Sequence, residues 1–243
     1  MQTDPKTIKK HFKQSMSTYS KNAVVQKITA EKIAENLVGK HFPIILEVGA
    51  GTGILTEIIA QKCSFDEYYA NDLVEKSKNY INKFVPDVKF FAGDFRKLKF
   101  NMKFDLIISN AVFQWCEDLE NVFKLCKNLL NEDGILAFST FSPENFKEIK
   151  SLTGISLKYF TVEEIKNFLS KDYEIIFAEE YEQKLNFDNP LKILKHMKDT
   201  GVNSISNDNW GIKDVKVFCE KYRFEYPDLS LTYSPIIVLA KLK

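Results

Sequence analysis

The sequence lacks the features that mark several common classes of protein. Its four cysteines lie far apart with no C-x-x-C pair, which excludes a zinc framework or a disulfide scaffold. Reduced thiols in a cytoplasmic protein are therefore expected. The stretch MQTDPKTIKKHFKQ lacks the apolar segment of a signal peptide, and no apolar run is long enough to span a bilayer. We expect no membrane partner.

Strong charge and clustered histidine are also missing. The formal net charge is +1, so no global field favours nucleic acid. His11, His41 and His196 are scattered, which argues against a histidine metal site. Two basic stretches, KTIKKHFK and LKILKHMK, are explained most simply as solvated helix faces. With 243 residues, the chain is long enough for one large α/β domain, and we expect a monomer.

Strand-like and helix-like patterns alternate over the first part of the chain. The predicted strands are 42–48, 65–72, 88–94, 104–110 and 134–141, and the predicted helices are 53–63, 74–85 and 119–130. Continuously apolar runs such as DLIIS are typical of parallel strands covered on both faces. The alternation therefore predicts an α/β fold with a doubly wound parallel sheet.

The regular alternation of strands and helices ends after residue 141. A helix is expected at 161–171, with Thr161 as N-cap and Glu164 three residues later. A long strand at 173–187, a helix ended by Gly201, a helix at 215–224 and a strand at 231–242 follow. We predict a single domain at 1–243, comprising an N-terminal helical cap (1–40), a core (41–187), a helical lid (188–225) and a last strand (226–243). The two helical pieces could together roof the sheet.

The stretch ILEVGAGTGILT places Gly49, Gly51 and Gly53 between a strand and a helix. In open parallel sheets, ligands bind beyond the carboxyl ends of the strands. The dinucleotide fingerprint needs a small residue three positions after its second glycine, where this chain has Ile54. The carboxylate of Glu47 would also repel a pyrophosphate, whereas it suits a ligand that carries an ammonium group.

The pattern E-x-G-x-G resembles the motif of class I S-adenosylmethionine-dependent methyltransferases. The resemblance implies a Rossmann-like, mostly parallel seven-stranded sheet with helices on both faces, and S-adenosylmethionine as cofactor. Asp72 ends the second strand and would hold the ribose diol, close to the spacing of about 20 residues seen in dinucleotide folds. Asp94 would receive the adenine amino group, and Phe95 would pack the ring. The implied cofactor-binding set is Gln26, Glu47, Gly49, Ala50, Gly51, Gly53, Asp72, Leu73, Asp94, Phe95, Ser109 and Asn110.

Each of these features has a simpler alternative. The glycines could form a plain strand-to-helix turn, and Asp72 and Asp94 could each cap a following helix. Acids or small polar residues at four strand ends are less easily explained by chance than any one of them. We therefore predict cofactor binding.

Most of the chain also resembles a narrower family, the malonyl-acyl-carrier-protein O-methyltransferases that start the pimelate portion of biotin synthesis. The resemblance lies in the stretches HFKQSMSTYSKNAVVQK, NAVFQWCEDL, AFSTFSPENFKEI, LKHMKDTGVNS and LTY, and its N-terminal pattern falls on Phe12, Tyr19, Ala23 and Gln26. One departure is Ser20, where relatives often carry Asp or Glu. Another is Lys195, where some relatives carry Arg and lysine lacks the bidentate fork.

This resemblance implies methyl transfer to the free carboxylate of a malonyl thioester, on acyl carrier protein or coenzyme A. A carboxylate is already a nucleophile at pH 7, so the site needs alignment rather than a general base. Tyr19 and Lys195 are the candidate catalytic residues, and Lys198 is a further candidate for binding the acyl group. Phe113 and Trp115, with the intervening Gln114, either wall the acceptor pocket or belong to the core.

The carrier protein is the expected partner, with no nucleic acid. Acyl carrier proteins are acidic, so a basic surface would steer them. Such a surface forms if the N-terminal helix lies beside the lid, which would bring together Lys9, Lys10, Lys13, Lys192 and Lys195. Two alternatives stay open: a methyltransferase for another small carboxylic acid, a quinone or a lipid, and a non-catalytic S-adenosylmethionine-binding protein.

Overall fold

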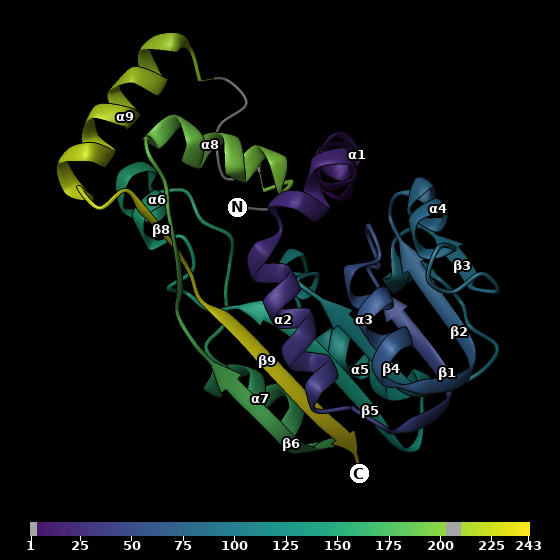
Figure 1. Ribbon diagram of the computed structural model, residues 1–243. Coiled ribbons are helices and arrows are strands. Elements are labelled where there is room, and N and C mark those ends of the chain that lie inside the picture. Colours follow the sequence, from purple (N-terminus) through teal and green to yellow (C-terminus); the bar gives the residue numbers. More distant parts are fainter. Residues whose placement is uncertain (1–3, 203–209) are drawn as a thin grey trace.

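Seven strands form one sheet in the order β3-β2-β1-β4-β5-β9-β6 (Figure 1). The computed structural model describes residues 4–202 and 210–243. Only β9 is antiparallel to its neighbours, so the predicted mostly parallel seven-stranded sheet is confirmed. The strands are β1 (His41–Val48), β2 (Ser64–Asp72), β3 (Lys89–Ala92), β4 (Phe104–Asn110), β5 (Leu130–Phe141), β6 (Tyr173–Glu180) and β9 (Pro235–Leu242).

Helices cover both faces of the sheet. The side chains of β9 show how, because successive residues of a strand point to opposite faces. Ile236 and Val238 pack with α5 (Leu119–Leu129) and α7 (Val162–Ser170), whereas Ile237 and Leu239 pack with α2 (Val24–Glu35) and α3 (Ile54–Lys62). A strand that is apolar on both sides must be buried on both sides, as the continuous apolar runs predicted. The predicted capping box of α7 is also present, since Thr161 and Glu164 bond reciprocally.

The helix predicted at 74–85 is mostly wrong. Only the 3₁₀ turn η1 (Glu75–Ser77) and the single-turn α4 (Lys78–Ile81) form there. The Val74 N–H donates to the carboxylate of Asp72 at 2.7 Å, which holds the start of this segment against the end of β2. Pro86 then disfavours helical backbone at the residue before it. The apolar spacing was therefore real, but the backbone is constrained at both ends.

The two long strands predicted at 173–187 and 231–242 are each broken. Their halves that leave the main sheet, β7 (Gln183–Asn186) and β8 (Ser230–Tyr233), pair with each other instead. The break before β9 has a local cause. Pro235 has no N–H to donate, and the Ser234 hydroxyl bonds the Ser142 hydroxyl at 2.8 Å. The β7–β8 ribbon thus leads from the sheet to the helices above it.

A helical layer lies over the carboxyl ends of the strands (Figure 1). It comprises α1 (Pro5–Asn22), α6 (Lys147–Thr153), α8 (Pro190–Asp199) and α9 (Ile212–Glu225). A separate core joins α6, α8 and α9 to the ribbon, with Ile193, Met197, Tyr222 and Tyr233 fully buried or nearly so. The predicted lid at 188–225 contains α8 and α9, although residues 203–209, with part of the LKHMKDTGVNS stretch, lie outside the described residues.

Helix α1 lies beside α8, as the carrier-docking hypothesis required (Figure 1). The Thr18 hydroxyl donates to the Asp199 carbonyl at 3.2 Å. A Cβ on Gly201 would lie 3.0 Å from the Ser15 hydroxyl oxygen, so the end of α8 touches α1 closely. The N-terminal helix and the lid therefore form one continuous roof over the sheet.

Candidate active site

The loop after β1 holds two glycines for different reasons. The Gly49 N–H and the Ala50 N–H both donate to the Asn71 carbonyl, at 2.8 and 2.9 Å, which ties the loop to β2. Gly49 has φ +71°, and a Cβ there would lie 2.2 Å from Val112 Cγ2. Gly51 has φ +55°, yet a Cβ there would come no closer than 3.9 Å to the Gly49 carbonyl oxygen. Gly49 is thus required for packing, whereas Gly51 leaves open space beside its backbone.

Asp72 connects this loop to the end of β2. Its Oδ2 accepts the Gly51 N–H at 2.8 Å, and its Oδ1 accepts the Val74 N–H at 2.7 Å. Burial raises the pKa of this carboxyl above its usual value, against these two backbone bonds. Each carboxylate oxygen retains a further lone pair. The capping and the ligand-binding interpretations of Asp72 are therefore compatible.

Glu47 is almost completely buried at the end of β1, with 1% of its surface exposed. Its Oε2 accepts from the Thr56 hydroxyl and the Tyr68 hydroxyl, both at 2.6 Å. Burial outweighs these bonds and raises the pKa of Glu47 to about 7. A cation beside it would restore the charged form.

Asp94 and Phe95 follow β3 and open the 3₁₀ turn η2 (Phe95–Lys97). The carboxylate of Asp94 is gripped by the Arg96 guanidinium, with Nε–Oδ1 at 2.8 Å and Nη2–Oδ2 at 2.7 Å. These hydrogen bonds lower the pKa of Asp94. Phe95 is buried beneath the turn, with 5% of its surface exposed. The sequence analysis missed Arg96, whose signal was its position directly after the Asp-Phe pair.

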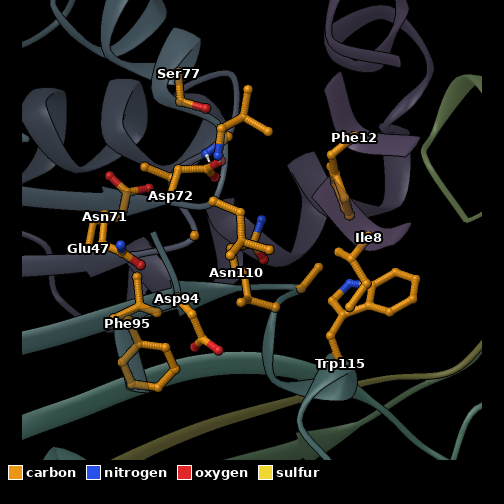
Figure 2. A pocket seen from close by; sticks show the side chains of 18 of the residues that line it. Ile8, Phe12, Glu47, Asn71, Asp72, Ser77, Asp94, Phe95, Asn110 and Trp115 are labelled. Carbon is orange, nitrogen blue, oxygen red and sulfur yellow. Dashed lines mark hydrogen bonds between the residues drawn. The ribbon is translucent and has the colours of Figure 1, made fainter. Parts of the chain in front are cut away.

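These strand ends open onto one cavity, which Figure 2 shows from close by. Glu47, Asn71 and Asp72 lie on one side of it, and Ile8, Phe12 and Trp115 lie on the other (Figure 2). We call it the crevice. Of the predicted cofactor-binding residues, the crevice is lined by Glu47, Gly49, Ala50, Gly51, Asp72, Leu73, Asp94, Phe95 and Asn110. Helix α1 closes it with side chains that the sequence analysis did not single out for this role, namely Pro5, Ile8 and Met16.

Three other predicted cofactor residues lie elsewhere among the described residues. Gly53, with φ +82°, is the N-cap of α3 and packs against Phe84, so its turn interpretation applies. Ser109 is fully buried and donates to the Val48 carbonyl at 3.0 Å, which links β4 to β1. Gln26 lines a second cavity instead. Asn110 reaches the crevice but also donates to the Gln26 carbonyl at 2.8 Å, which fixes α2 against β4.

The second cavity, which we call the chamber, adjoins the crevice. The two share Phe12, Tyr19, Ala111 and Trp115 as lining residues. The rest of its described lining is Gln26, Gln114, Phe141, Asn145, Phe146, Leu157, Tyr159, Thr200, Val202 and Tyr233, none of which carries a formal charge at neutral pH. The chamber is therefore an uncharged space that meets the crevice at a common wall.

Tyr19 stands in this common wall. Burial, and secondarily the charge of Asp72, raises the pKa of its phenol far above the usual value, so the hydroxyl stays protonated. Its ring centroid lies 5.9 Å from that of Phe12. Of the aromatic pair left open by the sequence, Trp115 lies in the wall, whereas Phe113 is fully buried and packs on Phe138 at 5.3 Å.

The two lid lysines lie outside both cavities as far as the described residues show. Lys195 and Lys198 are on the exposed side of α8. Lys195 forms an ion pair with Asp199 one turn later. An exposed pair of this kind contributes little to stability. Their predicted contact with the acyl group therefore stays a prediction.

Metal and membrane chemistry find little support in the described residues. No group of three or more His, Cys, Asp or Glu residues there is placed to hold a metal ion. No helix of residues 4–202 and 210–243 is long and apolar enough to cross a membrane. All four cysteines are reduced and buried, and burial raises the pKa of Cys116 to about 11, so it is a poor nucleophile at neutral pH.

The fold and the matched domain define a methyltransferase. The family described as "Methyltransferase domain" matches residues 46–138. Among solved structures, the YcgJ protein of Bacillus subtilis superposes with a TM-score of 0.61 at 14% identity, over 88% of this chain and 97% of that one. The N-methyltransferase NodS of Bradyrhizobium japonicum, solved with S-adenosyl-L-homocysteine, gives 0.54 at 11% identity, over 89% and 85%.

Curated relatives are similar over nearly the whole chain. A malonyl-[acyl-carrier protein] O-methyltransferase of Calditerrivibrio nitroreducens is 37% identical over 234 residues, 94% of each chain. That of Bacteroides thetaiotaomicron is 36% identical over 97% of each chain. That of Haemophilus influenzae is 32% identical over 98% of this chain and 95% of the relative. The chain belongs to this family of malonyl-[acyl-carrier protein] O-methyltransferases.

Proposed function

We propose that the protein transfers a methyl group from S-adenosylmethionine to the free carboxylate of a malonyl thioester carried by acyl carrier protein. The observation that carries this proposal is the pair of adjoining cavities, one lined by acids at the strand ends and the other uncharged, with Tyr19 in their common wall. The full-length similarity to named malonyl-[acyl-carrier protein] O-methyltransferases supports the same acceptor.

The crevice suits the cofactor because its described lining carries three acids and one cation, Arg96, which is paired with Asp94. Glu47, Asp72 and Asp94 converge there, which disfavours a pyrophosphate and favours a ligand with an ammonium and a sulfonium. Gly51 leaves room for a ligand to approach the backbone. Asp72 has lone pairs for ribose hydroxyls, and Phe95 lies at the position expected beside the adenine. When bound, S-adenosylmethionine supplies an electrophilic methyl, which a carboxylate oxygen takes while the sulfur retains the electrons of the broken bond.

The chamber suits the carboxylate end of an acyl acceptor by its chemistry, but its free volume is only about 10 Å³, so an acceptor enters only when the lining moves apart. The protein's task there is to hold a carboxylate oxygen in line with the methyl, and orientation of this kind can contribute roughly 7–11 kcal/mol. Tyr19 keeps its proton, so it can donate a hydrogen bond to the carboxylate from the common wall. The described lining contains no histidine or cysteine to act as a base, in agreement with a nucleophile that needs none.

The carrier would dock on the roof. Helices α1 and α8 lie side by side and carry Lys9, Lys10, Lys13, Lys192 and Lys195. A basic surface attracts an acidic carrier and speeds the encounter. We assign Lys195 to this surface rather than to the acyl group. The resemblance to the enzymes that begin pimelate synthesis supports a product at the start of the biotin pathway.

A substrate panel tests the proposal. The protein is incubated with methyl-labelled S-adenosylmethionine and, in parallel, malonyl-acyl carrier protein, malonyl-coenzyme A, free dicarboxylic acids and quinones. The expected result is label on the malonyl carrier that mild alkali removes, since a methyl ester is base-labile. Label on another acceptor, or label that survives alkali, would reject the assignment. Tight cofactor binding with no transfer to any acceptor would favour a non-catalytic binding protein.

A further inference from the structure

Three buried polar atoms around the chamber have no hydrogen-bond partner within the described residues. They are Gln26 Oε1, Gln114 Oε1 and Trp115 Nε1, and all three residues line the chamber. Buried polar groups are nearly always hydrogen-bonded, so each exception needs an explanation. Several exceptions around one cavity are explained together if a ligand completes their bonds.

Trp115 offers a donor at the reacting end. The indole Nε1–H can only donate, so its partner must be an oxygen or another acceptor. Trp115 lines both the crevice and the chamber, which places it at the common wall with Tyr19. An acceptor oxygen bound by Trp115 therefore lies next to the cofactor.

Gln114 offers a hydrogen-bond acceptor, whereas Trp115 offers a donor. Its Nε2 donates to the Ala111 carbonyl at 2.7 Å, which fixes the orientation of the amide and leaves Oε1 as the unpaired atom. That oxygen can only accept, so it repels a carboxylate and suits an N–H. Gln114 lines the chamber and is not among the residues that line the crevice, so it lies on the side away from the cofactor.

The absence of charge in the described lining bears on reactivity. A lysine or arginine against the acyl carboxylate would hold its charge tightly and weaken it as a nucleophile. Neutral donors position the same oxygen with less cost to its reactivity. They also bind the uncharged ester less tightly than the carboxylate, since hydrogen bonds to charged groups are the stronger ones.

We propose that the chamber binds an amide-bearing malonyl thioester in one direction. The Trp115 indole N–H donates to the carboxylate that is methylated, and Gln114 Oε1 accepts an amide N–H of the thioester arm. This rests on the proposed function and deepens it, because it names two specificity-determining residues and the chemical feature that each one recognises. The site thereby selects the thioester arm over a bare dicarboxylate of the same acyl length.

The test pairs two acceptors with three variants. The acceptors are the malonyl thioester of N-acetylcysteamine and its isostere, the malonyl thioester of 2-mercaptoethyl acetate, in which an ester oxygen replaces the amide N–H. The readout is kcat/KM for methylation, or Ki against malonyl-acyl carrier protein where turnover is slow. The wild-type protein should prefer the amide by roughly tenfold, the value of one good buried hydrogen bond.

Gln114→Met should abolish that preference, because it lowers kcat/KM only for the amide-bearing acceptor. Gln114→Glu keeps an accepting oxygen and should retain the preference. Trp115→Phe keeps an aromatic ring but removes the indole N–H, so it should lower kcat/KM for both acceptors by a similar factor, roughly tenfold. Cofactor affinity should stay unchanged in the Gln114 variants, and the circular dichroism spectrum of every variant should match that of the wild type, which shows that the fold is intact. If Trp115→Phe weakens cofactor binding, Trp115 belongs to the cofactor and not to the carboxylate.

Equal losses on both acceptors in Gln114→Met, or no wild-type preference for the amide, would overturn the proposed contact. An unchanged rate in Trp115→Phe would remove Trp115 from the carboxylate. Absence of methylation on the small thioesters and on malonyl-acyl carrier protein alike would instead reject the proposed function, so the two failures are distinct.

Discussion

The carboxylate of Asp72 accepts the backbone N–H of Gly51 at 2.8 Å. This bond fixes the glycine loop against the end of β2, and it orients Asp72 before any ligand arrives. A buried carboxylate held in this way can add hydroxyl partners with little reorganisation. The loop and the acid are therefore held as one unit, and we propose that they bind the ligand together.

Asp72→Ala should weaken S-adenosylmethionine binding, because it removes two charge-assisted hydrogen bonds of about 1.5–3 kcal/mol each. Isothermal calorimetry measures the dissociation constant. Asp172→Ala serves as the matched control, since its carboxylate pairs with Lys127 away from the crevice. A dissociation constant that does not change in Asp72→Ala would exclude this residue from the site.

Cofactor affinity should depend on pH through Glu47. In the free protein its pKa is about 7, and a cationic ligand beside it lowers that value. Below pH 7 the carboxyl must therefore lose its proton on binding, so affinity falls by up to roughly tenfold per pH unit, whereas above pH 7 this cost disappears. Glu47→Gln should bind more weakly and lose this part of the pH dependence. If titrations of the two proteins between pH 5.5 and 8.5 run parallel, Glu47 does not face the cationic group.

Tyr19→Phe should lower kcat while leaving cofactor affinity nearly intact. The variant keeps the ring that packs on Phe12 and removes only the hydroxyl. Loss of one hydrogen bond to a charged group corresponds to about 1.5–3 kcal/mol, roughly ten- to a hundredfold in rate. Steady-state kinetics with malonyl-acyl carrier protein measures the effect, with Tyr80→Phe as a control outside both cavities. A fall in cofactor affinity instead would assign Tyr19 to the cofactor.

Charge reversal on the roof should affect the carrier and spare small acceptors. Lys10→Glu together with Lys192→Glu should raise the KM for malonyl-acyl carrier protein several-fold at low salt, and added salt should shrink the difference. The KM for a malonyl thioester of N-acetylcysteamine should not change. Equal effects on both acceptors would place these lysines in the acyl site and refute a docking role.

Much of the fold could be predicted from local patterns. The glycine loop and the acids at the strand ends have signatures that depend on a few neighbouring residues. The break after β6 could not be predicted in the same way, because the β7–β8 pair joins segments far apart in sequence. Pro235 was a local signal for the break before β9. The spacing of apolar residues does not say which partner a strand takes.

The candidate site could be predicted where a residue follows a single strand. It could not be predicted where a residue's role depends on contacts between elements. Asp72 and Asp94 follow strands, so their position needs only the strand to be right. Arg96 was missed although it bonds Asp94 only two residues away. Asn71 was missed because its side chain donates to the Phe91 carbonyl on the neighbouring strand β3. Phe113 and Trp115 are close in sequence yet lie in the core and in a cavity wall, a difference that only the packing of α1 over the sheet decides.

The most direct test of the account is a crystal structure of the protein with S-adenosyl-L-homocysteine and a stable malonyl thioester analogue. The account predicts the nucleoside in the crevice, its ribose on Asp72, and the acyl carboxylate in the chamber, with the cofactor sulfur and a carboxylate oxygen facing each other beside Tyr19. A nucleoside bound elsewhere, or an acyl group that lies against Lys195 and Lys198 with the chamber empty, would contradict it.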